Sequence, residues 1–364
     1  MKQDTEGNLF SRENSNVMRG LAIMAIMYHN LLHTKTFGFS VENEMSFSYQ
    51  RVEAFLQAMK GDRCWGADVV SFLGWLGVPV FIFLTGYGLA IKYTPSQLNN
   101  HNTPEQFLEG SRFLRHSYLK LFLLMLPAVF LFAIPDLVVH EYLSVAKKLF
   151  SLTLLSNFNY PVLSYSPGVY WYFSLTFQYY VLFYLLQHRW FTDQWLFIGS
   201  VASLVILVFL VEIEMPWLLS VYRHCFTGWF PLFSLGIWQA HRDDKYAGIG
   251  WGKCSMIVVC TAVLVFLMNL NLIAWSVVPI VALMFFISLS RLLLMFNRLR
   301  LIIAWIGRYS AFVFVCHPIA RAIVYRINNS IPLYGVIVIY FFLTMLLAVL
   351  YCRLYKKIIV LFKV

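Results

Sequence analysis

The sequence predicts an all-α, polytopic membrane protein with about ten transmembrane helices. Hydrophobic residues make up 60% of its 364 residues and charged residues only 12%. An ordinary soluble domain carries about 25% charged residues, so there is too little polar surface here for a water-soluble body. Ten apolar segments approach or exceed the length that a helix needs to cross the hydrocarbon layer. Several are apolar around their whole circumference, as lipid-exposed helices are.

The ten expected spans are separated by polar breaks that often hold Pro, Gly or Asn. They cover residues 16–35, 68–92, 113–134, 168–188, 194–212, 217–239, 253–270, 272–294, 299–325 and 332–360. The two longest connections, 36–67 and 135–167, mix apolar and polar residues, which favours short interfacial helices there. No internal repeat is evident, so we expect one membrane domain over residues 1–364 that opens with a polar segment, 1–15.

The placement of Lys and Arg predicts the orientation of these spans, because cytoplasmic loops carry an excess of both. With the amino terminus inside, 19 of the 28 Lys and Arg residues fall on the inner side. Both termini are therefore expected in the cytoplasm, and the protein in the cell membrane, plasma or inner, among its lipids. The net charge of +11 has the same origin, so we expect no nucleic-acid partner. The oligomeric state is left open.

The first span carries the most informative polar side chains, because ionisable groups inside a membrane are costly and usually functional. His29 lies about two-thirds of the way along it, and Arg19 lies near its start. An imidazole takes a proton from a hydroxyl near neutral pH, so His29 is a candidate general base, with helix packing as the alternative. His33 shares its face, but no third ligand accompanies the pair nearby, so we expect no metal.

Further polar and aromatic groups lie in later spans. Arg223 is placed either to face an acceptor or to extend toward the membrane surface. His317 stands beside Pro318, where packing at a kink is the plainer interpretation. Trp171 belongs to an aromatic-rich stretch that is able to stack on a sugar, although anchoring at the interface is the commoner reason for such residues.

Four segments, in their order along the chain, resemble the motifs of the membrane acyltransferase-3 family and together span most of the sequence. They are Arg19 to His29, Leu76 to Tyr87, Arg112 to Pro127, and Trp171 to Tyr179 with the later Ile306 to Ser310 and His317-Pro318. This family moves acyl groups onto sugars and other hydroxylated acceptors. The resemblance implies an O-acyltransferase that passes an acyl group, expected to be acetyl, from acyl-coenzyme A to a hydroxyl of a cell-surface glycan or glycolipid.

The resemblance also implies roles for particular residues. His29 would be the catalytic base or an acyl relay, and Arg19 would orient the site or bind the donor's phosphates. Inner-face cations would clamp these phosphates, namely Arg112, Arg115, Lys120 and Arg308, although the positive-inside bias explains the same residues without a ligand. The expected acceptor-binding residues are Trp171, Gln178, Arg223 and His317.

The chain departs from the family pattern in three places. Nine residues separate Arg19 from His29 where the family has ten, and Asn30 holds the usual position. Eleven steps on a helix return nearly to one face, whereas ten leave the second side chain about 80° away. Either His29 works from a shifted register or a local distortion restores it. The usual Ser-Gly is Thr85-Gly86, which keeps a hydroxyl, and Gln178 cannot transfer protons as an acid or base.

A transporter or flippase for a glycan or a lipid-linked sugar is the alternative from another class. It would share the spans, the aromatic residues and the buried cations. It would need neither a phosphate clamp nor a buried base, and transporters often show repeated halves, which this sequence does not.

Overall fold

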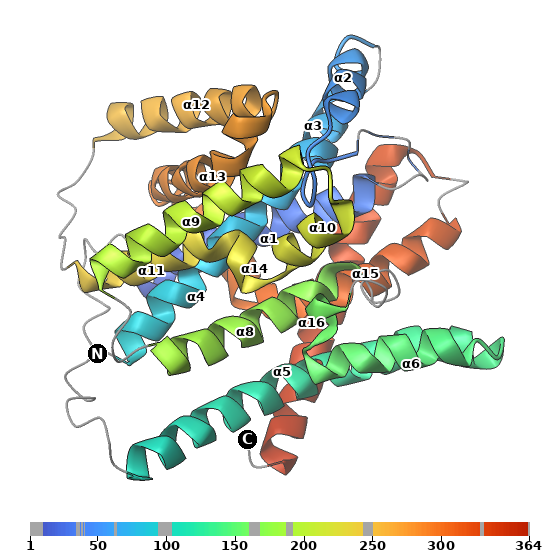
Figure 1. Cartoon of the computed structure of the whole chain (residues 1–364). Coiled ribbons are helices and arrows are strands. Elements are labelled where there is room, and N and C mark those ends of the chain that lie inside the picture. The colour runs from blue at the N-terminus through green and yellow to red at the C-terminus, as the bar shows by residue number, and fades with distance from the viewer. Residues whose placement is uncertain are drawn as a thin grey trace. The chain divides into compact units, whose positions relative to one another are not determined.

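The computed structural model describes residues 10–33, 37, 39, 41–61, 64–93, 104–159, 168–186, 192–242, 250–327 and 331–362, without the side chains of 104–110, 168, 186 and 327. Every regular element in these residues is a helix, which confirms the all-α prediction (Figure 1). The α-helices are α1 (Arg12–Leu32), α2 (Tyr49–Ala58), α3 (Trp65–Leu73), α4 (Val78–Lys92), α5 (Pro104–Val138), α6 (Tyr142–Phe150), α8 (Trp171–Leu186), α9 (Asp193–Glu212), α10 (Pro216–His224), α11 (Phe230–His241), α12 (Trp251–Met268), α13 (Leu272–Leu293), α14 (Asn297–Arg308), α15 (Ser310–Ile327) and α16 (Leu333–Leu361). Short 3-10 turns are η1 (Gly74–Gly77), η3 (Ser151–Thr153), η4 (Ser156–Phe158), η5 (Gly168–Tyr170) and η6 (Phe226–Trp229).

Six helices in the described residues are long and apolar enough to cross a membrane. They are Trp65–Lys92, Ser111–Val138, Asp193–Glu212, Trp251–Met268, Leu272–Leu293 and Leu333–Leu361. A seventh is reached if α14 and α15, which are bent by 76° at their junction, count as one span. The protein is therefore a helical membrane protein, and its ten crossings and cytoplasmic termini stay predictions.

Three of the expected spans are helical but do not meet those criteria. The first, α1, carries arginine, histidine and several asparagines. The fourth, α8, has only 16 residues. The expected span 217–239 is broken into α10, η6 and α11. The two long connections hold the short helices α2 and α6, as predicted.

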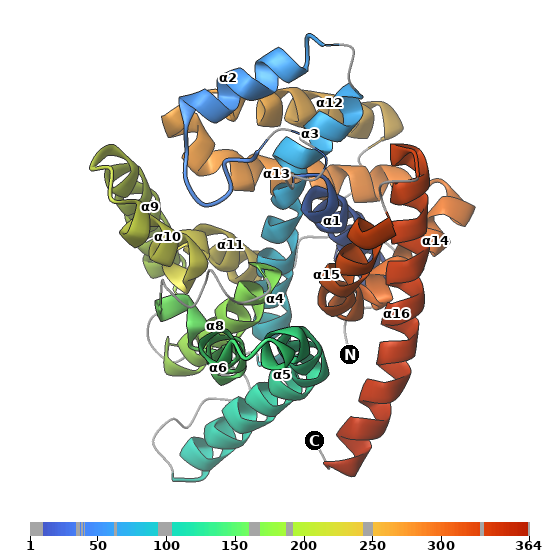
Figure 2. The same cartoon turned by 90° about the vertical axis from the view of Figure 1, so that its right-hand side faces the viewer.

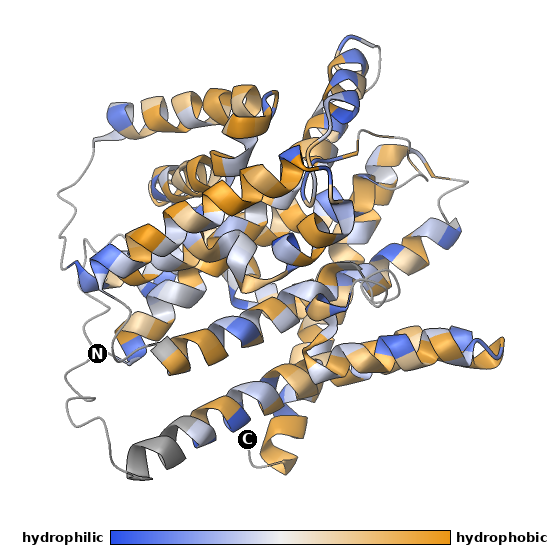
Figure 3. Cartoon of the chain, in the orientation of Figure 1, coloured by the Kyte–Doolittle hydropathy of each residue, from blue (hydrophilic) through white to orange (hydrophobic). Residues whose placement is uncertain are grey.

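Helices α9 and α12 are rich in apolar residues (Figure 3), and most of each helix is not buried inside the described structure. On α9 these include Phe197, Val205 and Phe209, all more than half exposed. On α12 they include Met256 and Val259. Such exposure is unfavourable in water but suits hydrocarbon, so these helices support the membrane assignment.

The chain divides into two compact units. Unit 1 comprises Met1–Leu84, Arg242–Phe314 and Arg321–Met345, and unit 2 comprises Thr85–His241, Val315–Ala320 and Leu346–Val364. The single membrane domain expected over residues 1–364 stays a prediction, and the polar segment 1–15 lies partly outside the described residues.

In unit 1, α1 packs against α3, η1, α13 and α14. Glycines make the close approaches possible. A Cβ atom at Gly307 would overlap the backbone oxygen of Asn16, and one at Gly77 would overlap that of Ala22. Elsewhere in this unit α2 and α3 lie beside α12 (Figure 2). Phe55 of α2 stacks on Phe72 of α3, with ring centroids 4.2 Å apart, and Phe266 of α12 packs against them.

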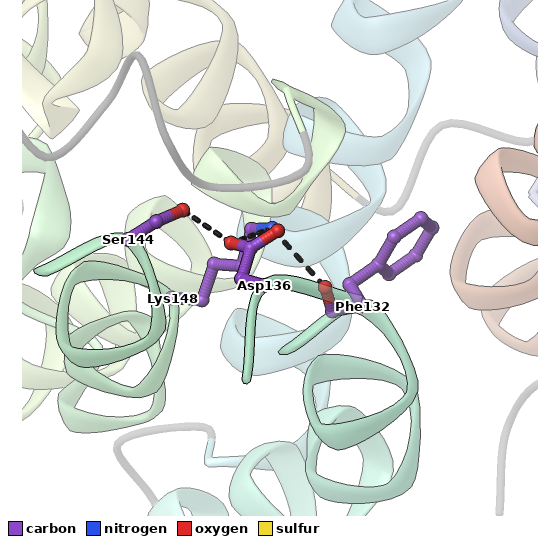
Figure 4. Close-up of polar contacts among 4 residues, drawn as sticks. All are labelled: Phe132, Asp136, Ser144 and Lys148. Atoms are coloured by element: carbon purple, nitrogen blue, oxygen red, sulfur yellow. Dashed lines mark hydrogen bonds and ion pairs between the residues drawn. The ribbon is translucent and has the colours of Figure 1, made fainter. Parts of the chain in front are cut away.

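In unit 2, an ion pair closes the turn between α5 and α6 (Figure 4). The Lys148 ammonium donates to the Asp136 carboxylate and to the backbone oxygen of Phe132, 3.1 Å away. Ser144 donates to the same carboxylate oxygen. Both charged side chains are 16% exposed, so the pair is shielded enough to matter for the position of α6.

Candidate active site

His29 is buried in unit 1 and its ring is held from one side. Its Nδ1 lies 2.9 Å from the backbone oxygen of Ser71, near the end of α3, where the last carbonyls of a helix have no intrahelical partner. A carbonyl only accepts, so Nδ1 carries a hydrogen in this contact. When the ring is neutral, the lone pair therefore lies on Nε2, and this outer nitrogen is able to accept a proton.

Three side chains from α15 and α16 fasten the end of α1 that carries His29. Arg321 donates to the backbone oxygen of Asn30 over 2.8 Å, Tyr325 to that of Leu31 over 3.0 Å, and Tyr340 to that of Met27 over 3.0 Å. The Asn30 and Leu31 carbonyls belong to the last turn of α1, where a helix leaves carbonyls without an intrahelical partner, whereas Met27 lies one turn earlier. Sequence reasoning missed both tyrosines, because nothing in their own spans distinguishes them from interfacial anchors.

Arg19 and His29 are not brought together. Helix α1 is regular from Arg12 to Leu32, so no local distortion compensates for the missing residue. Ten residues along a regular helix separate the two side chains by about 15 Å and by about 80° around the axis. Arg19 lies half-buried, 3.4 Å from the Asn16 side-chain oxygen. Of the two alternatives, the shifted register is the one that the structure adopts.

Asn30, which holds the family's usual histidine position, is not directed like His29. Its side-chain nitrogen donates to the backbone oxygen of Ile26, one turn earlier on the same helix, over 2.9 Å. The two neighbouring positions therefore have different surroundings, and only position 29 meets Ser71.

The expectation that no third ligand accompanies His29 and His33 is wrong. Their rings stack with centroids 4.5 Å apart and an angle of 10° between their planes. The connection after α1 returns Glu42 to this pair, and one ligand atom from each of the three residues lies within 4.8 Å of the other two. Sequence reasoning missed Glu42 because its position depends on how the connection folds back.

The cations expected to bind the donor are all exposed. Arg112, Arg115 and Lys120 lie along α5 in unit 2, whereas Arg308 ends α14 in unit 1. In unit 2, Tyr355 and Tyr351 of α16 donate to the backbone oxygens of Lys120 and Leu124, over 3.0 and 2.7 Å. The basic part of α5 is thereby held against α16, whose exposed Lys356 is a further cation of this unit.

Three of the four expected acceptor-binding residues gather around the break between α10 and α11. Gln178 accepts from the backbone N–H of Phe226 over 2.9 Å. The Arg223 guanidinium lies 4.1 Å from the Trp229 ring, and Trp171 stacks on the same indole with centroids 6.1 Å apart. All of these side chains are buried, as is the fourth expected residue, His317. In the described structure they support the broken helix, and their acceptor-binding role stays a prediction.

The fold and the site together define a class of protein. It is a helical membrane protein with a buried imidazole that a backbone carbonyl holds in place. The model of the acyltransferase-3 family, described as an acyltransferase domain, matches residues 12–353, which is nearly the whole chain. The chain belongs to this family and is an acyltransferase. No curated protein and no solved structure matches it.

Proposed function

We propose that this protein is an O-acyltransferase of the cell membrane. It transfers an acyl group, acetyl in the first instance, from acyl-coenzyme A to a hydroxyl of a cell-surface glycan or glycolipid. The observation that carries the proposal is the hydrogen bond from His29 Nδ1 to the Ser71 backbone oxygen. It leaves Nε2 with the lone pair that a general base needs.

The reaction requires one bond to form and one to break at the thioester carbonyl. The acceptor oxygen attacks that carbonyl and gives its proton to His29 Nε2, and the coenzyme A thiolate leaves. A thioester already has a good leaving group, so a base and correct positioning carry most of the acceleration. Positioning supplies about 7–11 kcal/mol of a barrier, and a general base contributes about 10²–10⁴-fold.

Arg19 is too far from His29 to touch the same reacting atoms. We assign it to the phosphate end of the donor, because coenzyme A is long and carries its phosphates far from its thioester. As further donor-binding cations we propose Arg112, Arg115 and Lys120, because they are exposed along one stretch of helix α5. Arg308, which is exposed at the end of α14, is proposed as another donor-binding cation.

Labelled acetyl-coenzyme A, incubated with membranes that contain the protein, tests the proposal. Label is expected on a glycan or glycolipid fraction. His29→Gln keeps a side-chain N–H for the Ser71 oxygen but has no basic nitrogen, so it should lower incorporation by about 10²–10⁴-fold at normal protein levels. His241→Gln is the matched control, because His241 is exposed at the end of α11, and it should retain full incorporation.

Two results would count against this assignment. Incorporation that survives His29→Gln would remove the base from the mechanism. Movement of a glycan or a lipid-linked sugar across the membrane without any label on it would favour the transporter or flippase instead.

A further inference from the structure

Glu42 in unit 1 has a carboxylate oxygen whose hydrogen-bonding capacity is unsatisfied within the described structure. Its Oε2 is buried and has no hydrogen-bond partner among the described residues. A buried carboxylate oxygen without a partner is costly, so a ligand that satisfies it is expected. The group within reach is the histidine pair, because one ligand atom each of His29, His33 and Glu42 lies within 4.8 Å of the others.

Both histidines are oriented as metal ligands are. His33 Nδ1 lies 2.8 Å from the backbone oxygen of His29, as His29 Nδ1 lies 2.9 Å from that of Ser71. Each ring therefore donates from Nδ1 to a carbonyl, which places the lone pair of the neutral ring on Nε2. Histidine ligands almost always donate their second ring N–H in this way, which fixes the tautomer and the ring direction. The four-residue spacing also places both rings on one helix face, as in known zinc motifs.

Glu42 is held in place by hydrogen bonds that do not use its carboxylate, although the Arg51 guanidinium also attracts that carboxylate by its charge. Arg51 donates to its backbone oxygen over 2.6 Å and to Ser46 Oγ over 2.6 Å. The next residue, Asn43, accepts from the indole of Trp275 in α13 over 2.7 Å through its backbone oxygen. The chain is thus fastened at Glu42 itself and at the residues that follow it, so less conformational entropy is lost when the carboxylate binds a ligand.

The ligand types narrow the kind of ion. The guanidinium groups of Arg51 and Arg321 lie near the cluster and repel any divalent cation, so the ion must be held by strong bonds to its ligands. Two imidazoles and one carboxylate suit Zn²⁺ and similar transition-metal ions, whereas Mg²⁺ and Ca²⁺ take oxygen ligands. In a tetrahedral zinc site the ligand atoms stand about 3.3 Å apart. The three ligand atoms here lie within 4.8 Å of one another, so modest side-chain rotations would bring them to that separation.

We propose that His29, His33 and Glu42 bind one Zn²⁺-class ion, and that this ion inhibits acyl transfer. The inhibitory part rests on the proposed function, in which His29 Nε2 accepts a proton from the acceptor hydroxyl. The same nitrogen cannot hold a metal and take that proton. The earlier expectation of no metal depended on a missing third ligand, and the fold supplies that ligand.

Metal binding is tested directly on the full chain, purified in detergent and stripped with a chelator. Zn²⁺ is titrated, bound zinc is measured after gel filtration, and Co²⁺ absorption reports the coordination. One ion per chain is expected, together with a zinc-dependent rise in Tm, because a ligand that binds the folded state stabilises it. His33→Asn and Glu42→Gln should each weaken Zn²⁺ binding at least tenfold.

Two matched variants control for general effects of these changes. Glu53→Gln removes an exposed carboxylate on the neighbouring helix α2. His140→Asn removes an exposed histidine in a left-handed conformation, φ 62°, which asparagine tolerates. Both should bind zinc as the unchanged protein does. Equal zinc binding by the unchanged protein, His33→Asn and Glu42→Gln would overturn the site.

Acyl transfer, measured with and without Zn²⁺ and normalised to each variant's zinc-free rate, tests the inhibition. The unchanged protein should lose most of its acyl-transfer activity with one equivalent of zinc and regain it when a chelator is added. The His33→Asn variant should need at least tenfold more zinc for the same degree of inhibition. Zinc-dependent activity would overturn the inhibitory role. Zinc binding by a stripped protein that transfers no acyl group would support the metal site and contradict the proposed function.

Discussion

Gly74 lies so close to His29 that a methyl group at position 74 would stand 2.6 Å from the His29 Cβ atom. Ser71, one turn earlier in the same segment, accepts the hydrogen bond from the His29 ring. The segment that joins α3 to η1 therefore determines both how closely its backbone approaches α1 and in which direction the His29 imidazole points. The second family-like motif begins only two residues later, at Leu76.

Gly74→Ala should accordingly impair the base while leaving most of the fold intact. The added methyl group must push α1 away from η1, which shifts the imidazole, and a displacement of about 1 Å in a catalytic group costs up to about 10²-fold in rate. We expect kcat to fall about 10- to 100-fold with a smaller change in the Tm of the purified protein. Gly66→Ala is the control, since a Cβ there meets nothing within 4 Å. An unchanged kcat for Gly74→Ala would contradict the close packing.

Exchanging positions 29 and 30 tests the shifted register. The double variant His29→Asn, Asn30→His restores the family's usual spacing from Arg19. We expect it to be as inactive as His29→Asn alone, because position 30 lies about 100° further around the helix and does not meet Ser71. The measurement is label transfer by membranes with matched protein levels. Recovery of activity in the double variant would show that the usual register is the working one.

The exposed cations of α5 should affect donor binding rather than the chemical step. Arg115→Ala and Lys120→Ala should each raise the KM for acetyl-coenzyme A about tenfold, because a hydrogen bond to a charged group contributes about 1.5–3 kcal/mol. Arg326→Ala, which removes an exposed cation at the end of α15, should leave KM unchanged. Steady-state kinetics at varied concentrations of acetyl-coenzyme A give KM and kcat for each variant and so separate donor binding from the chemical step. A fall in kcat alone would argue against a phosphate contact.

The packing of α1 on α14 should depend on Gly307. A Cβ atom there would overlap the backbone of Asn16, which cannot move aside as a flexible side chain does. Gly307→Ala should lower the free energy of unfolding by about 1–3 kcal/mol, as overpacking does. Gly252→Ala should instead raise it by about 0.5–1 kcal/mol, because that helical glycine meets nothing within 4 Å. Thermal unfolding in detergent compares the two, and equal effects would contradict the close crossing.

Removing one partner of the ion pair between Lys148 and Asp136 (Figure 4) should destabilise the protein more than replacing both partners. Lys148→Met leaves the Asp136 carboxylate without its cation and should destabilise the protein by about 1–3 kcal/mol. That cost is below the value for a fully buried pair, since 16% of each side chain is exposed. The double variant Asp136→Leu, Lys148→Met should recover most of the loss. A double variant that is as unstable as the sum of its singles would show that the two residues do not interact.

Much of the helical layout was predictable because it depends on local properties. Apolar composition and helical period place each expected span on a helix, and the mixed connections do contain α2 and α6. The candidate base was equally visible, since a histidine inside an apolar segment is conspicuous. Span 217–239 shows the limit of this reasoning, because hydropathy does not reveal that η6 interrupts it.

The partners of the site were not predictable in the same way. Ser71, Gly74 and Glu42 are ordinary residues in their own segments, and they matter only because the chain folds them onto His29. The burial of Arg223 likewise follows from Trp229, whose ring covers the guanidinium. A single sequence carries no signal for such pairings.

By itself the sequence determined a helical membrane acyltransferase with one conspicuous imidazole, because hydrophobicity, helical period and motif order are written along the chain. Tertiary structure alone decided which nitrogen of His29 faces the Ser71 carbonyl and that Glu42 joins the histidine pair. These outcomes depend on hydrogen bonds and close contacts between segments that are separate in sequence. Local patterns constrain each helix, whereas packing selects which side chains meet.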